Sequence, residues 1–86
     1  MTPDELLRLY PRETLRWLRG RLGLSQEAFA EHIGVGTQTV ASWETRRQGI
    51  GRPNLARLVA LVAPHLATPE GAAFARSLGR GEAAEG

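Results

Sequence analysis

The amino-acid sequence predicts an all-α fold, a compact bundle of about five helices, on three observations. No run of residues shows the apolar and polar alternation of a half-buried strand. Signals that start a helix recur along the chain, with capping side chains at Thr2, Ser25 and Thr68. Apolar residues also recur at helical spacing, most regularly at Leu55, Leu58, Val59 and Val62.

Length and composition limit the class of protein. Eighty-six residues, 42% of them hydrophobic, can build one small domain with a modest core. No apolar stretch approaches the roughly 20 residues that cross a bilayer, and the first residues lack the basic-then-apolar order of a secretory signal. We therefore expect a cytoplasmic protein with no membrane partner. Cysteine is absent, which excludes disulfides and thiolate metal sites.

The eleven basic residues are all arginine, and nine of them fall in two clusters, with Arg76 and Arg80 beyond. No arginine occurs in residues 22–45, which lie between the clusters. The first cluster is Arg8, Arg12, Arg16, Arg19 and Arg21, and the second is Arg46, Arg47, Arg52 and Arg57. A guanidinium suits phosphate because it donates two parallel hydrogen bonds. An arginine-only composition is also typical of a GC-rich genome, so charge alone leaves a nucleic-acid partner open.

The first 23 residues predict a short helix followed by a longer one. Thr2 is a capping residue, and Glu5 stands three positions later, where it can complete a capping box. Pro11 interrupts the first helical turns, and a second helix is expected over about residues 12–22. Gly23 can end that helix in the left-handed conformation.

Two short helices are predicted next. Ser25 is a good N-cap for a helix that runs to Ile33, and Gly34 ends that helix. A further helix is expected over about residues 37–45, with Trp43 on its inner face as a core residue. The two helices are therefore joined by a short turn that contains glycine.

The remaining residues predict a loop and two more helices. The loop, residues 46–52, is rich in arginine and glycine. Asn54 is expected to cap the next helix, which Pro64 closes. Thr68 opens the last helix. We expect residues 80–86, which have nothing to bury, to be a flexible tail.

Residues 26–45 satisfy the demands of two helices that cross at a steep angle. Ala30 is small enough for the second of these helices to approach the first closely. Gly34 supplies the positive φ that the turn needs. Phe29, Val40 and Trp43 are apolar where the helices face the core. These features predict a helix-turn-helix.

Residues 24–44 resemble the Cro/C1-type, or Xre-family, helix-turn-helix. The shared pattern is Leu24-Ser25-Gln26, Phe29-Ala30, Ile33-Gly34-Val35, Thr39-Val40 and Trp43-Glu44. The resemblance covers about residues 14–62 and implies a lambda-repressor-like domain. One departure follows Glu44: Arg46 stands where the family usually has glycine, and the loop before Pro53 is longer by two or three residues.

We accordingly divide the chain into four segments. They are an N-terminal helical extension (1–13), the helix-turn-helix DNA-binding domain (14–63), a C-terminal helix (64–79) and the flexible tail (80–86).

The resemblance implies that residues 37–45 lie in the DNA major groove. We expect Thr37, Gln38 and Ser42 to read base edges, and Gln38 to pair with adenine. Gln26 resembles the family glutamine that bonds a phosphate and buttresses the recognition helix. The remaining contacts expected with the DNA backbone come from Thr39, Thr45, Arg46, Arg47 and Arg52.

Other side chains are assigned by their surroundings in the sequence. Glu44 is expected to make an internal polar contact, since a carboxylate facing phosphate would be repelled. Trp17 belongs either to the edge of the core or to a subunit contact. The same alternative, core or partner, holds for Leu61, Phe74 and Leu78.

Nothing in the sequence indicates catalysis or a cofactor. His32 and His65 lack ligand spacing and are expected to face solvent, so no metal is predicted. Ser25 is explained by capping, and neither a base nor an orienting partner is recognisable beside it. We therefore predict a protein that is not an enzyme and needs no cofactor.

The resemblance implies a regulator of transcription that binds double-stranded DNA. The leading hypothesis is a repressor that binds a pseudo-palindromic operator as a homodimer. A second hypothesis is an antitoxin that represses its own operon and also grips a toxin protein. A third is a protein-protein adaptor that uses the same fold.

Overall fold

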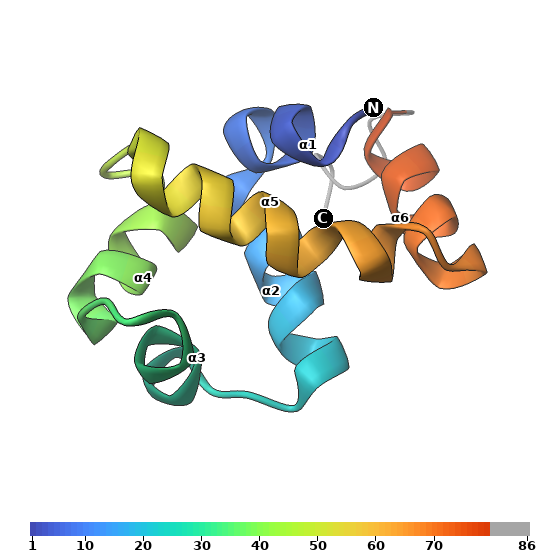
Figure 1. The fold of residues 1–86 in the computed structure, drawn as a ribbon. Helices are drawn as coiled ribbons and strands as arrows, with labels where there is room; N and C mark the ends of the chain where they lie inside the picture. Colours follow the sequence, from blue (N-terminus) through green and yellow to red (C-terminus); the bar gives the residue numbers. More distant parts are fainter. Residues whose placement is uncertain (80–86) are drawn as a thin grey trace.

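The computed structural model describes residues 1–79. Six helices occur in this range: α1 (Pro3–Leu9), α2 (Pro11–Leu22), α3 (Gln26–Ile33), α4 (Thr37–Glu44), α5 (Arg52–Leu66) and α6 (Pro69–Gly79) (Figure 1). No strand occurs among the described residues, which confirms the all-α prediction. The tail predicted at 80–86 lies outside them.

The long helix α5 crosses the molecule from the side of α4 to the side of α6 (Figure 1). The pair α3 and α4 forms one end, and α6 forms the other. Helix α1 packs against both α2 and α5, and α2 also packs against α4. The helix-turn-helix pair is thus supported from behind by α2.

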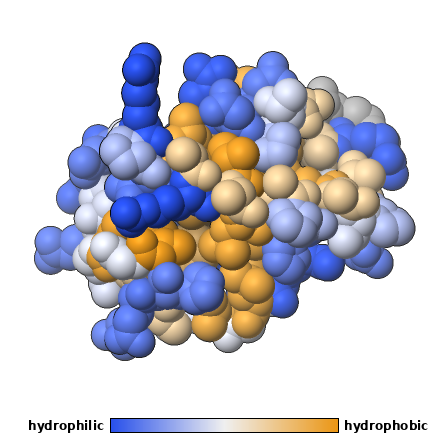
Figure 2. Space-filling view, viewed as in Figure 1, coloured by the Kyte–Doolittle hydropathy of each residue, from blue (hydrophilic) through white to orange (hydrophobic). Residues whose placement is uncertain are grey.

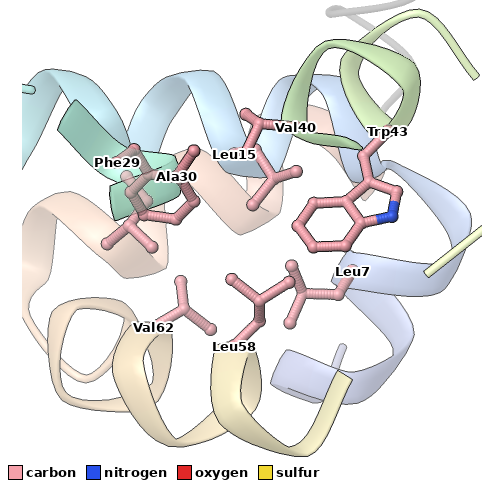
Figure 3. Close-up of a cluster of buried hydrophobic side chains, with 9 residues drawn as sticks. Leu7, Leu15, Phe29, Ala30, Val40, Trp43, Leu58 and Val62 are labelled. Carbon is pink, nitrogen blue, oxygen red and sulfur yellow. The ribbon is translucent and has the colours of Figure 1, made fainter. Parts of the chain in front are cut away.

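The core collects side chains from five helices, which point toward one another in Figure 3. Leu7 of α1, Leu15 of α2, Phe29 of α3, Trp43 of α4 and Leu58 of α5 are each at most 1% exposed. Trp43 is therefore a core residue, as predicted. Because the inner face of α4 is fixed in this core, its opposite face is left toward solvent.

Helix α1, predicted as an extension, is built into the fold. Leu6 and Leu7 are completely buried. The hydroxyl of Thr14 donates to the Leu6 carbonyl over 3.2 Å, a bond that joins α2 to α1. The boundary predicted after residue 13 falls inside α2, because proline at a first helical position starts a helix without loss of a hydrogen bond.

Helix α5 is longer at both ends than the sequence predicted. The prediction that Asn54 caps it is wrong: Gly51 is the N-cap, and Pro53 fits in the first turn. The prediction that Pro64 closes it is also wrong, because the helix continues to Leu66. Pro64 and Ala60, whose carbonyl loses its helical donor, are both exposed, so water can satisfy that carbonyl. The boundary predicted after residue 63 therefore falls inside α5.

Helices α5 and α6 meet at a sharp corner with a bend of 113°. The Thr68 hydroxyl accepts a hydrogen bond from the Gly71 N–H at 3.0 Å, which confirms Thr68 as the start of α6. Gly71 is buried, and a Cβ added there would overlap the carbonyl oxygen of His65 and the Cα of Leu66. The corner therefore depends on a residue without a side chain.

Within residues 1–79, no single helix is long and apolar enough to cross a membrane. Together α5 and α6 reach that length and composition, but only across their 113° bend. Their apolar residues Leu58, Val62 and Leu78 are buried within the protein.

Candidate nucleic-acid interface

The turn between α3 and α4 is formed by two local features that the sequence predicted. The Ser25 hydroxyl accepts the Ala28 N–H at 3.1 Å and so caps α3. Gly34 ends α3 with φ 79°, in the left-handed region. The Val35 N–H then bonds the Ala30 carbonyl at 2.9 Å, which turns the chain toward α4. Both features are confirmed.

One side of α4, its outer face, lies away from the core. It consists of Gln38, Ala41, Ser42 and Thr45, residues spaced at one helical turn. These four and Arg47 line one open hollow. The outer face carries no charge of its own and presents an amide, a methyl group and two hydroxyls.

The other predicted contact residues of α4 flank this face. Thr37 is exposed at the first helical position, and Thr39 is partly exposed. The Thr45 hydroxyl donates to the Ala41 carbonyl at 2.9 Å, which leaves its lone pairs for an outside donor. The structure therefore brings Gln38, Ser42 and Thr45 together and places Thr37 and Thr39 beside them.

The buried carboxylate of Glu44 anchors the end of α4. Glu44 is 3% exposed, and Arg19 of α2 grips it with two hydrogen bonds, Nε to Oε2 at 2.8 Å and Nη2 to Oε1 at 2.9 Å. Arg19 also donates to the Leu24 carbonyl at 3.2 Å. The hydrogen bond with Glu44 raises the pKa of Arg19 above its ordinary value. The predicted internal contact of Glu44 is confirmed.

Gln26, the first residue of α3, reaches the same carboxylate. Its Nε2 donates to Glu44 Oε1 at 3.2 Å and so joins the start of α3 to the end of α4. An amide nitrogen carries two protons, so one donor is left for an outside acceptor. The buttressing half of the predicted role of Gln26 is thus visible in the structure, and the phosphate contact stays a prediction.

Arg46, directly after α4, adopts a conformation that favours glycine. Its φ is 61°, the only positive φ of a non-glycine residue among residues 1–79. Its N–H bonds the Trp43 carbonyl at 3.3 Å, and the next N–H, of Arg47, bonds the Ser42 carbonyl at 2.9 Å. This pair of bonds is the usual left-handed helix ending. Arg46 thus adopts the left-handed conformation that glycine usually provides at the end of a helix.

Comparison with known proteins agrees with this geometry. A family model described as a helix-turn-helix domain matches residues 12–73. The chain belongs to the helix-turn-helix domain family. Membership indicates a DNA-binding protein, while the narrower Cro/C1-type resemblance stays a prediction. Neither the search of curated proteins nor that of solved structures gave a match.

Several arginines of the helix-turn-helix protein form hydrogen bonds within the chain. Arg57 donates to the Ile33 carbonyl at 3.3 Å and so satisfies the end of α3. Arg21 donates to Nδ1 of His65 at 3.2 Å. These internal contacts could not be predicted from charge clusters, because the sequence alone does not show which elements lie opposite each arginine.

Other arginines remain open to a ligand. Arg46 lies 3.5 Å from Glu13 Oε1, a buried oxygen with no hydrogen-bond partner in the described residues. Arg47 and Arg52 are exposed, and their guanidinium groups form no ion pair or hydrogen bond within residues 1–79. Among the exposed arginines after α4, Arg46 thus forms an ion pair within residues 1–79, and Arg47 and Arg52 do not.

Trp17 belongs to the fold of one chain, at the edge of its core. Its ring stacks on Phe74 of α6, with centroids 4.8 Å apart and an interplanar angle of 8°. The Arg21 guanidinium lies 5.2 Å from the Trp17 ring centroid. His65 is partly exposed and accepts a hydrogen bond from Arg21 at the surface, and His32 is exposed as predicted.

The C-terminal apolar residues, for which core or partner contacts were predicted, make contacts within the chain. Leu78 is 1% exposed, and Leu61 packs against the core cluster. Together with stacked Phe74, they contact their own chain. Among residues 1–79, no group of three or more His, Cys, Asp or Glu side chains is placed to hold a metal ion.

Proposed function

We propose that this protein is a sequence-specific regulator of transcription that places α4 in the major groove of double-stranded DNA. The outer face of α4 carries the proposal. A groove-reading helix needs exposed hydrogen-bonding side chains on one side and a rigid attachment on the other. The hollow lined by Gln38 and Ser42 provides the first, and buried Trp43 and Glu44 provide the second.

Each side chain of this face has a partner on a base edge. The Gln38 amide can donate to and accept from adenine at N7 and N6. The Ser42 and Thr37 hydroxyls suit several bases, and the Ala41 methyl suits the methyl group of thymine. The face therefore favours A·T pairs in the part of the site that it touches.

Backbone contacts come from residues around this face. Gln26 retains one amide proton, and Thr39 is partly exposed near the start of α4. Arg46 lies in the loop between α4 and α5, and Arg52 is the first residue of α5. Such contacts set the position of the protein on DNA without reading sequence.

We further infer a homodimer that represses by occupying its operator. Two half-sites one helical turn apart, about 34 Å, double the contact that one small domain can make. Ala56, Ala60 and Pro64 are exposed along α5, and apolar surface gathers where α5 crosses the molecule (Figure 2). A dimer that covers two adjacent grooves would exclude other proteins from that DNA.

Selection of bound fragments from random duplex DNA tests the proposal. The recovered sites should contain two inverted half-sites whose centres are about 10 base pairs apart. Gln38→Ala should weaken binding to the selected site by about 1 to 3 kcal/mol and leave binding to random DNA nearly unchanged. Equal losses on both DNAs would remove Gln38 from base reading, and recovery of no enriched site would refute the proposed function.

A further inference from the structure

Helix α4 contains no arginine, yet an arginine reaches its outer face. Arg47 lies beyond the end of the helix, and it lines the same hollow as Gln38, Ala41, Ser42 and Thr45. From the sequence alone we predicted a phosphate contact for it. Its position instead makes Arg47 part of the surface that faces bases in the proposed complex.

The backbone holds Arg47 in that position. Its N–H bonds the Ser42 carbonyl at 2.9 Å, so the chain folds back over the last turn of α4. This return requires the left-handed φ of 61° at Arg46. The unusual conformation of one arginine therefore directs the next one toward the outer face.

The two neighbouring arginines differ in what their side chains contact. Arg46 lies 3.5 Å from Glu13 Oε1 on α2. Arg47 has no such ion pair within the described residues, and its donors are available for a ligand in the hollow. Of the two, Arg47 is the one that lines the hollow together with Gln38, and it is exposed.

We propose that Arg47 reads a guanine in the same half-site as Gln38. The inference rests on the proposed function and adds a specificity residue to it. A guanidinium can donate two parallel hydrogen bonds to O6 and N7 of guanine in the major groove. The site would then combine a G·C pair read by Arg47 with A·T pairs read by the uncharged side chains of α4.

The first test compares Arg47→Ala with Arg52→Ala in selections from random DNA. Arg52 is the matched control, because it is also exposed but does not line the hollow. Arg47→Ala should reduce the preference for guanine at one position of each half-site by about 5-fold to 150-fold. Arg52→Ala should leave every base preference unchanged, and the melting temperature of both variants should match that of the wild type.

The second test removes one acceptor from the DNA. Replacing that guanine with 7-deazaguanine deletes N7, so wild-type affinity should fall several-fold while the affinity of Arg47→Ala does not change. Equal losses for both proteins, or a uniform loss of Arg47→Ala on all sequences, would overturn the base-reading role and return Arg47 to the backbone. If the wild type selects no DNA, the proposed function itself fails; if it selects sites whose preferences Arg47→Ala leaves unchanged, only this inference fails.

Discussion

Different kinds of interaction stabilise the two ends of the molecule. At the end formed by α3 and α4, a buried carboxylate, Glu44, receives hydrogen bonds from Arg19 and Gln26. At the other end, α6 meets α5 through a bare backbone contact at Gly71 and meets α2 through a ring stack between Phe74 and Trp17. The first end depends on charge and the second on shape, so different substitutions should damage them.

The largest effect is expected at the polar end, from Glu44→Ala. The substitution leaves Arg19, whose side chain is 18% exposed, without its bidentate partner. Removing one member of a buried ion pair costs about 3 to 5 kcal/mol, because the other charge is left poorly solvated. We expect a loss of free energy of unfolding near the lower end of that range, measured by urea denaturation.

Arg16→Ala is the control for this prediction. Arg16 lies 3.6 Å from the same carboxylate, but its side chain is 57% exposed. Exposed pairs contribute about 0 to 1 kcal/mol. If both substitutions had the same effect, burial of Glu44 would not be what stabilises this end.

The next largest effect is expected at the apolar end, from Gly71→Ala. The added Cβ would meet backbone atoms of His65 and Leu66, which cannot move as a flexible side chain can. Overpacking typically costs about 1 to 3 kcal/mol. The corner between α5 and α6 should open, and the melting temperature should fall. The tryptophan fluorescence should also change, because Trp17 would no longer stack on Phe74.

A second glycine gives the opposite expectation. Gly20 lies in α2, is exposed, and has open space around an added Cβ. Gly20→Ala should raise the free energy of unfolding by about 0.5 to 1 kcal/mol, because alanine loses less conformational freedom in a helix. A destabilised Gly20→Ala protein would contradict the distinction between the two sites.

The sequence predicted the α3–α4 end better than the α5–α6 end, because the first depends on local interactions and the second on contacts between helices. Ser25 and Gly34 act within a few residues, through a cap and a left-handed turn, so local rules located the turn before α4. Gly71 matters only because another helix lies against it, and Pro64 is tolerated only because it faces outward. Local patterns do not contain that information.

Part of the candidate site was likewise predictable from local spacing, and part was not. The spacing within α4 indicated which residues share its outer face, and Gln38 and Ser42 do lie together there. The presence of Arg47 on the same hollow depends on a chain reversal after the helix. The missing glycine at position 46 was the available signal, but the sequence could not show that arginine would adopt the glycine conformation.

An effect similar in size to that at Gly20 is expected from a pair of substitutions at Arg46. Both Arg46→Gly and Arg46→Ala remove the ion pair with Glu13, but only glycine relieves the left-handed strain. Arg46→Gly should therefore be more stable than Arg46→Ala by about 1 kcal/mol. Chemical denaturation of the two variants side by side measures this difference, and equal stabilities would mean that the helix ending carries no strain.

The smallest effect is expected at α1. This helix buries apolar side chains, as the apolar end does, but a charged residue takes part in its N-terminal cap. Leu6 and Leu7 are fully buried, whereas Glu5 completes a capping box with Thr2 at the surface. Hydrogen bonds from Thr2 hold the pKa of Glu5 below its ordinary value of 4.5. The lowered pKa means that the cap stabilises the fold above about pH 4.5 and that this contribution is lost as the pH falls through the lower, folded value.

Glu5→Ala should lower the melting temperature slightly at pH 7, and the difference from the wild type should vanish in strong acid. A difference that stayed constant with pH would show that Glu5 acts through packing, and α1 would then resemble the apolar end in every respect.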